Sequence, residues 1–128
     1  MIWQEQVLSL QRDDRTELVF PGWWDLPGGG REGAESPVDC ALRETLEEVN
    51  LMVPAERITW GRQFADPPGR AVWFFVARME AIDPEGISLG NEGRDLAFLP
   101  IERFLTHPRV VPHFQSRLRL GLDHMRRD

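Results

Sequence analysis

The sequence contains a single cysteine, no long apolar run and no excess of basic charge. With Cys40 alone no intramolecular disulfide can form, which fits a reducing compartment, so we expect a cytoplasmic protein. No apolar stretch approaches the roughly 20 residues that a membrane-spanning helix needs. The first residues, MIWQEQVLSLQRDD, lack the basic and apolar regions of a signal peptide, and no membrane partner is expected.

Acidic residues outnumber basic ones by 21 to 15, and the net charge is −6. Such a surface repels phosphate backbones, so nucleic acid is not an expected partner. A small phosphorylated molecule remains compatible with this charge if a divalent cation mediates the contact. The 128 residues, 41% hydrophobic and 28% charged, predict one globular domain over residues 1–128.

The pattern of apolar residues predicts a layered domain of the α/β (α+β) class, because strands and helices are expected to alternate along the chain. The segment at 70–80 is nearly continuously apolar, which favours a place inside the sheet. The sequence DPPG at 66–69 predicts a turn before it. Strands are expected at 6–12, 57–65, 70–80 and 95–100, a short extended piece at 23–27, and helices at 36–49, at 100–105 and from Pro112 onward.

The expected helix at 36–49 has recognisable ends. Ser36 is a favourable N-cap, Pro37 suits the first helical position, and Asn50 tolerates the left-handed conformation that often ends a helix. One face of the helix must pack on the core, and at helical spacing it carries Val38, Ala41, Leu42, Thr45 and Val49.

Glu44, Glu47 and Glu48 share another face of this helix. Arg43 stands four residues before Glu47 and can brace it, whereas nothing in the helix is expected to brace Glu44 or Glu48. A solvated helix face is the plain alternative for three carboxylates. Two features argue against it: like charges at this spacing cost about 0.2–0.5 kcal/mol per pair, and a glycine run at 28–30 precedes the helix. Clustered carboxylate oxygens suit a hard cation such as Mg²⁺, and glycines let the main chain approach a metal or a phosphate.

The spacing of these residues resembles the Nudix box, which reads G-x5-E-x7-R-E-U-x-E-E-x-G-U, where U is a bulky aliphatic residue. Gly29, Glu35 and the run RETLEEVNL stand at the matching positions, and every fixed glycine or charged residue up to the glutamate pair is present. Two positions depart from the pattern, because Thr45 replaces the aliphatic residue and Asn50 replaces the second glycine. Neither change removes a carboxylate, so neither argues against an active enzyme.

The resemblance implies a Nudix fold, in which a mixed β-sheet is sandwiched between α-helices and carries a loop–helix–loop catalytic motif. It implies hydrolysis of a diphosphate linkage in a nucleoside diphosphate joined to another group, with Mg²⁺ as cofactor and Mn²⁺ as a substitute. On the matching positions, the metal ligands would be Glu44, Glu47, Glu48 and the carbonyl of Gly28. Arg43 would orient Glu47 by a salt bridge.

Further roles come from the same resemblance. Glu35 would support the loop and the start of the helix. Glu92, in GNEGRD, stands where some relatives place an extra metal-binding or base glutamate, and an ordinary turn carboxylate is an equal alternative. The general base is expected among Glu44, Glu47 and Glu92, since glutamates coupled around a metal do not titrate independently.

Three residues are candidates for substrate contact: Arg12, Gly29 and Trp73. Relatives often place a phosphate-contacting arginine at the end of the strand where Arg12 stands, while an exposed strand-end arginine is the plain alternative. Gly29 would bring main chain close to a phosphate. Trp73 could stack on a base, although such residues more often belong to the core.

The expected substrate is a nucleoside triphosphate or a similar small nucleotide, with ADP-ribose or a nucleotide sugar as the alternative. Relatives that remove oxidised dGTP carry an asparagine shortly before the last helix, and PRVVPHF at 108–114 has none. A non-catalytic nucleotide-sensing module is the other interpretation. The intact glutamate set favours the enzyme, a hydrolase acting on phosphoric anhydrides.

The start of the chain is unusual for this family. Only five residues precede Gln6, whereas relatives usually have a further strand before this point. We therefore expect either a start further upstream or the loss of an edge strand. A lost strand would leave an unpaired edge, which favours a homodimer.

Overall fold

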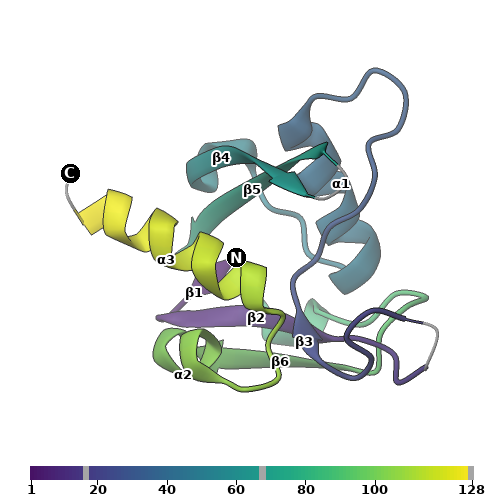
Figure 1. The fold of residues 1–128 in the computed structure, drawn as a ribbon. Coiled ribbons are helices and arrows are strands. Elements are labelled where there is room, and N and C mark those ends of the chain that lie inside the picture. The colour runs from purple at the N-terminus through teal and green to yellow at the C-terminus, as the bar shows by residue number, and fades with distance from the viewer. Residues whose placement is uncertain (16–17, 67–68, 127–128) are drawn as a thin grey trace.

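The computed structural model describes residues 1–15, 18–66 and 69–126. Its strands follow the order β3-β2-β1-β5-β4, with β6 paired to β2, and helices lie on both sides of them (Figure 1). The strands are β1 Ile2–Trp3, β2 Gln6–Gln11, β3 Trp24–Asp25, β4 Ile58–Asp66, β5 Arg70–Met79 and β6 Asp95–Pro100. The helices are α1 Pro37–Val49, α2 Ile101–Thr106 and α3 Pro112–Arg126, with 3-10 turns at Ala55–Arg57 and Pro84–Gly86.

The sheet is mixed. β1 pairs antiparallel with β2 and parallel with β5, and β4 and β5 form an antiparallel hairpin. Because β6 pairs with every residue of β2, strands β1 and β3 must share the opposite edge of β2. From β3 the chain rises away from the sheet towards the start of α1 (Figure 1).

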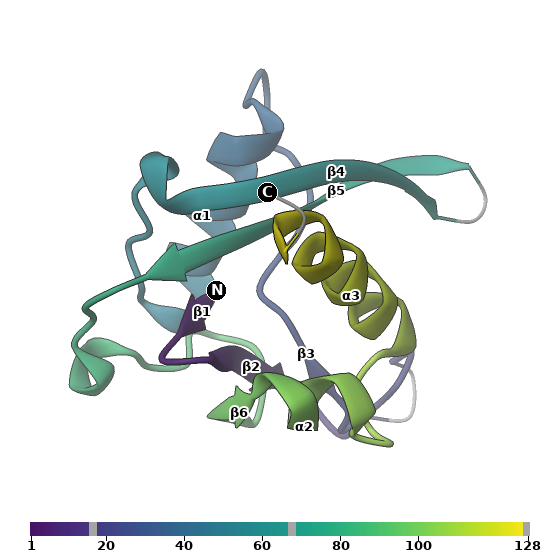
Figure 2. The ribbon, with the colours of Figure 1, turned by 90° about the vertical axis from the view of Figure 1, so that its left-hand side faces the viewer.

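Successive strand residues point to opposite faces of the sheet, which gives two cores. Val7 and Val76 belong to the core that also contains residues of α2 and α3, whereas Leu8 and Ala77 belong to the core at the end of α1. Figure 2 accordingly shows α1 and α3 on opposite sides of the β4–β5 hairpin. The predicted class, a mixed sheet between helices, is confirmed.

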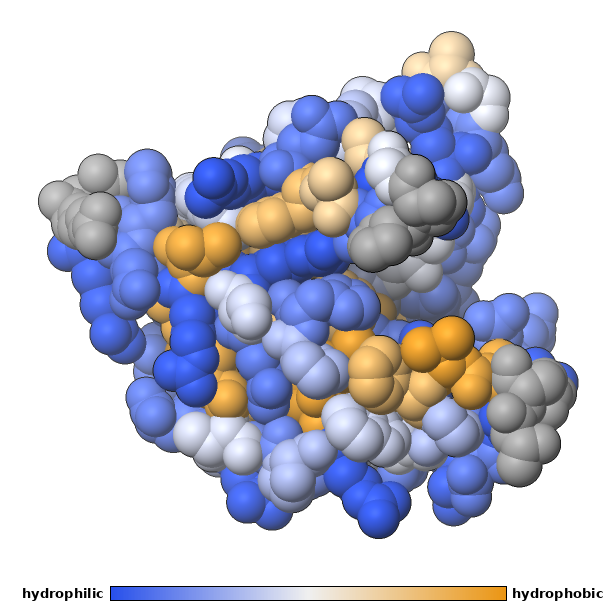
Figure 3. Space-filling model, viewed as in Figure 1, coloured by the Kyte–Doolittle hydropathy of each residue, from blue (hydrophilic) through white to orange (hydrophobic). Residues whose placement is uncertain are grey.

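Most expected elements appear within one or two residues of their predicted bounds. The turn predicted at 66–69 has its two central residues outside the described ranges, and its ends are joined by a hydrogen bond of 2.7 Å from the Gly69 amide to the Asp66 carbonyl. Hydrophilic residues cover most of the face seen in Figure 3, as the charged composition predicts. Within the described ranges, no helix is both long and apolar enough to cross a membrane.

A strand of two residues precedes residue 6, where relatives usually have one. Ile2 pairs with Val7 of β2 and with Arg78 of β5, so β1 lies inside the sheet and not at its edge. The prediction that this strand is lost is therefore wrong. An unpaired edge left by a lost strand therefore no longer supports a homodimer, and the homodimer stays an untested prediction.

Candidate active site

Helix α1 begins and ends as predicted. The Asp39 amide donates to Oγ of Ser36 at 3.1 Å, and Pro37 is the first helical residue. Asn50 has φ 56° and ψ 37°, and its amide donates to the carbonyl of Leu46 at 3.0 Å. Local hydrogen bonds thus fix both ends of the helix that carries the glutamates.

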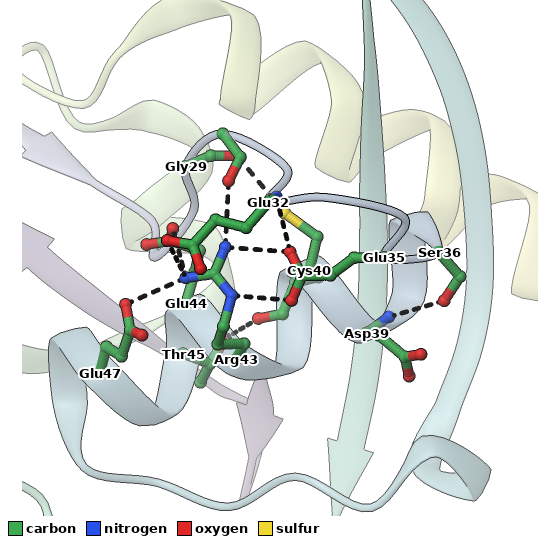
Figure 4. A network of polar contacts seen from close by, with 12 residues as sticks. Gly29, Glu32, Glu35, Ser36, Asp39, Cys40, Arg43, Glu44, Thr45 and Glu47 are labelled. Atoms are coloured by element: carbon green, nitrogen blue, oxygen red, sulfur yellow. Dashed lines mark hydrogen bonds and ion pairs between the residues drawn. The ribbon is translucent and has the colours of Figure 1, made fainter.

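Arg43 is the centre of a polar network (Figure 4). Its guanidinium donates to both carboxylate oxygens of Glu35 at 2.8 and 3.1 Å, and to the carbonyl of Gly30 at 3.0 Å. Nη1 donates to Glu44 at 3.0 Å and to Glu47 at 3.1 Å. The predicted contact with Glu47 is present. The expectation that no helix residue braces Glu44 is wrong, because the guanidinium of Arg43 has several N–H donors and bonds to Glu44 and Glu47 at the same time.

Glu35 connects the glycine-rich loop to the helix. Besides its two bonds from Arg43, it accepts a hydrogen bond of 2.8 Å from the Glu32 amide. Arg43 is the main cause that lowers the pKa of Glu35, and Glu35 is the main cause that raises the pKa of Arg43. The pair therefore stays charged, and the loop is held against the start of α1.

The glycine run reaches the glutamates by close approach of the main chain. The Gly28 amide donates to Oε2 of Glu48 at 2.9 Å. A Cβ on Gly29 would stand 2.6 to 2.8 Å from the carboxylate of Glu44, so only glycine fits there without displacing that side chain. The free thiol of Cys40 lies near the same turn and donates to the Gly29 carbonyl at 3.7 Å.

Glu48 is half-buried among other carboxylates. Its pKa is raised to about 7, mainly by burial and to a smaller extent by the charges of Glu44, Asp25 and Glu92, while the hydrogen bond from the Gly28 amide acts in the opposite direction. Acidic side chains from β3, α1 and the segment before β6 therefore all act on Glu48 through their charge. The hydrogen bond from the Gly28 amide only partly offsets the effects of burial and of the neighbouring carboxylates on Glu48.

Asp25 has no role in the sequence prediction, yet it belongs to this group. Oδ2 accepts a hydrogen bond of 2.7 Å from Nη1 of Arg12, and Oδ1 accepts one of 2.7 Å from the Leu26 amide. Burial raises the pKa of Asp25 against the opposing effect of both partners. The available signal was a lone acid in the apolar stretch WWDLP, directly before the glycine run.

Arg12 lies at the end of β2, where the sequence placed it. Its salt bridge with Asp25 is largely shielded, since the two side chains are 31% and 14% exposed. Within the described residues, its buried Nε has no hydrogen-bond partner. The guanidinium is thus held at one end of the acidic group with a donor still unused.

Trp73 belongs to β5, and Glu92 belongs to the segment before β6. Trp73 points to the same sheet face as Ala77, which packs in the core at the end of α1. Trp73 is 46% exposed, and its ring stacks on Phe75 with 5.7 Å between centroids and 6° between planes. Glu92 is exposed in the segment that leads to β6, and its charge reaches Glu48.

The donors in this group fit a hard divalent cation. Among the described residues, no three Asp, Glu, His or Cys side chains already stand close enough to hold a metal together. Glu44 and Glu47 instead both accept hydrogen bonds from Arg43. All candidate donors are carboxylate or carbonyl oxygens, which suit Mg²⁺ or Mn²⁺. Burial is the main cause of the raised pKa of Glu48, with neighbouring carboxylates adding to it, and a bound cation would stabilise the charged form.

The chain is similar to known proteins. Residues 1–118 match the family model of the NUDIX domain. An uncharacterised Nudix hydrolase of Pseudomonas aeruginosa is 34% identical over 121 residues, which cover 91% of this chain and 70% of that protein. A mitochondrial coenzyme A diphosphatase of Homo sapiens is 34% identical over 113 residues, which cover 84% of this chain and 48% of that protein.

Similarity extends to solved structures. The crystal structure of an Ap4A hydrolase of C. elegans superposes with a TM-score of 0.73 at 20% identity, covering 96% of this chain and 89% of that one. The chain belongs to the Nudix family, and it is a hydrolase of the pyrophosphohydrolase class. The predicted family and Nudix fold are confirmed.

Proposed function

We propose that this chain hydrolyses a diphosphate linkage in a small nucleotide, with Mg²⁺ as cofactor. The observation that carries the proposal is the half-buried Glu48, which is bonded to the glycine turn and on which the charges of Glu44, Asp25 and Glu92 all act. Like charges gathered at this cost are typical of sites that work with a cation. A highly charged diphosphate needs such a cation before it can approach an acidic site.

The proposed metal ligands are the carboxylates of Glu44, Glu47 and Glu48 and the carbonyl of Gly28. A bound divalent cation would neutralise the diphosphate and lower the pKa of a water molecule that attacks phosphorus. Mn²⁺ is the expected substitute, because it accepts the same oxygen ligands.

The chain's own residues position these groups. Arg43 and Glu35 act as positioning residues, since their network fixes the side chains of Glu44 and Glu47. The general base is proposed to be one of Glu44, Glu47 and Glu92. Because these carboxylates interact, their titration belongs to the group and not to any one residue.

Two residues are proposed to bind the substrate outside the metal centre. Arg12 would contact a phosphate, and the partial exposure of its side chain at the end of β2 supports this role. Trp73 would stack on the base, supported by its exposure and its parallel arrangement with Phe75. A nucleoside triphosphate or similar small nucleotide is the proposed substrate, and ADP-ribose or a nucleotide sugar is the alternative.

The test is a panel of nucleoside triphosphates, ADP-ribose, nucleotide sugars and coenzyme A, assayed for phosphate or pyrophosphate release. Hydrolysis of at least one compound with Mg²⁺, and none with EDTA, is expected. Glu47→Gln should abolish it, while Glu56→Gln, on an exposed 3-10 turn, should not. Tight nucleotide binding without release in any reaction would instead mean a nucleotide-sensing module.

Two further predictions stand beside the reaction. A cytoplasmic location is proposed on the ground of the lone Cys40. The exclusion of nucleic acid partners is proposed on the net charge of −6.

A further inference from the structure

Asn50 makes a contact that the glycine of the Nudix box could not make. Its main chain adopts the left-handed conformation that glycine would supply, with φ 56°. Its side-chain Nδ2 in addition donates to the carbonyl of Gly86 at 2.8 Å. The substitution therefore keeps the end of α1 and adds a link to the segment between β5 and β6.

That segment continues along the end of α1 (Figure 1). The Ser88 amide donates to the Val49 carbonyl at 3.1 Å, and the Gly90 amide donates to the Glu48 carbonyl at 2.9 Å. The last carbonyls of a helix have no partner within the helix, so the segment satisfies two of them. Three hydrogen bonds, one of them from Asn50, thus join residues 86–90 to α1.

Gly90 shows how close this contact is. A Cβ at this position would collide with the main-chain carbonyl oxygen of Glu47. A backbone atom cannot turn aside as a flexible side chain can, so any larger residue would lift the segment from the helix. Glycine is required here by the approach of two main chains and not by an unusual φ.

The segment is also fixed beyond this point. The Arg94 amide donates to the Gln11 carbonyl at the end of β2, at 2.9 Å. Glu92 therefore lies between two anchors, one on α1 at Gly90 and one on β2 at Arg94. This explains why its charge acts on Glu48 although no helix or strand carries it.

We propose that Asn50 is a positioning residue for the catalytic site: its amide, through Gly86, keeps the 86–94 segment on the end of α1 and so holds Glu92 beside Glu48. Gly90 serves the same purpose by allowing the contact. The inference rests on the proposed function, because the part of Glu92 in metal binding belongs to that proposal.

The first experiment needs no metal and no substrate. Asn50→Gly keeps the helix end and removes only the amide, so it should fold. Hydrogen exchange of the Ser88 and Gly90 amides should be roughly fivefold faster in this variant, the factor that corresponds to a contact of about 1 kcal/mol. Thr45→Val, at the other departure from the box, should leave both amides unchanged, because the Thr45 hydroxyl donates back to the Ala41 carbonyl within the helix, at 2.8 Å.

The second experiment is a double-mutant cycle between Asn50 and Glu92, read out by Mn²⁺ affinity in electron paramagnetic resonance. Asn50→Gly and Glu92→Gln should each weaken Mn²⁺ binding, by about tenfold. The double variant should bind no more weakly than Glu92→Gln alone, because Asn50 acts through Glu92. Gly90→Ala should reproduce the effect of Asn50→Gly.

Each outcome decides the matter. Unchanged exchange in Asn50→Gly, additive losses in the cycle, or unchanged Mn²⁺ affinity in Glu92→Gln overturns the inference, even if the wild type hydrolyses nucleotides. If the wild type hydrolyses nothing in the substrate panel while the cycle gives the expected pattern, the proposed function fails and the positioning role of Asn50 stands.

Discussion

The main-chain amide of Gly28 donates a hydrogen bond of 2.9 Å to Oε2 of Glu48, across 20 residues of chain. The bond joins the glycine turn before α1 to the last turn of that helix. It favours the charged form of Glu48, whereas burial and three neighbouring carboxylates disfavour that form and raise the pKa. The charged carboxylate is therefore held at a cost, and the cost depends on pH and on cations.

Without divalent cations, the stability of the protein should fall as the pH rises from about 5 to about 8. The folded state raises the pKa of Glu48 from 4.5 to about 7, so the folded protein holds this proton more tightly than the unfolded chain. The stabilisation is complete below pH 4.5 and is lost as the pH rises through 7. Because Glu48 is half-exposed, we expect about 1–2 kcal/mol after allowance for solvent screening.

Thermal unfolding in EDTA of the wild type and Glu48→Gln measures this effect. Between about pH 5 and pH 8, the difference in Tm between the two proteins should change by several degrees, because the Tm of the wild type falls relative to that of the variant as the pH rises. Mg²⁺ at about pH 8 should raise the Tm of the wild type more than that of the variant. A difference in Tm that is independent of pH would contradict the prediction.

Arg43→Lys should lower the rate of hydrolysis by about 10- to 100-fold, the usual loss when a partner of metal ligands is removed. A lysine has one ammonium and cannot hold Glu35, Glu44 and Glu47 at once, whereas the guanidinium bonds to all three. The Mg²⁺ concentration for half-maximal rate should rise, and the Tm should fall. Arg31→Lys, at an exposed position of the same loop, is the matched control and should behave as wild type.

Local signals explain why α1 was predictable. The Ser36 cap, Pro37 at the first position and the left-handed Asn50 act within a few residues of chain, and the structure contains all three. The shared face of the glutamates likewise follows from helical periodicity alone. The final helix was predicted for the same reason, since Leu118 and Leu122 stand one turn apart in its buried stripe.

Contacts between distant segments were not predictable. The acidic role of Asp25, the Gly28–Glu48 bond and the docking of residues 86–90 depend on how β3, α1 and the segment before β6 meet in space. Hydrophobic periodicity and turn residues report local structure, so they do not predict contacts between distant segments. The two-residue strand β1 is too short for any alternation of apolar and polar residues to be recognised.

Ser36→Ala should destabilise the protein by about 1 kcal/mol, the usual effect of losing an N-cap side chain. The Asp39 amide would lose the acceptor that it has at 3.1 Å. Ser116→Ala is the matched control: its hydroxyl bonds back to the Pro112 carbonyl at 3.4 Å on an exposed face of α3, so alanine should be neutral or slightly stabilising. Urea unfolding of both variants measures the difference, and equal losses of stability would contradict the role of Ser36 as a cap.

Gly29→Ala should damage the site with little effect on the fold. The added Cβ would stand 2.6 to 2.8 Å from the Glu44 carboxylate, and the flexible side chain would move rather than the turn. We expect Mn²⁺ affinity and the rate of hydrolysis to fall by about 10- to 100-fold. This is the usual loss when a group that orients a metal ligand is removed, and we expect displacement of the Glu44 carboxylate to have an effect of the same size. Gly30→Ala is the control, since nothing lies within 4 Å of its added Cβ. If both variants lose activity to the same extent, general stiffening of the loop, and not the contact with Glu44, determines the requirement for glycine.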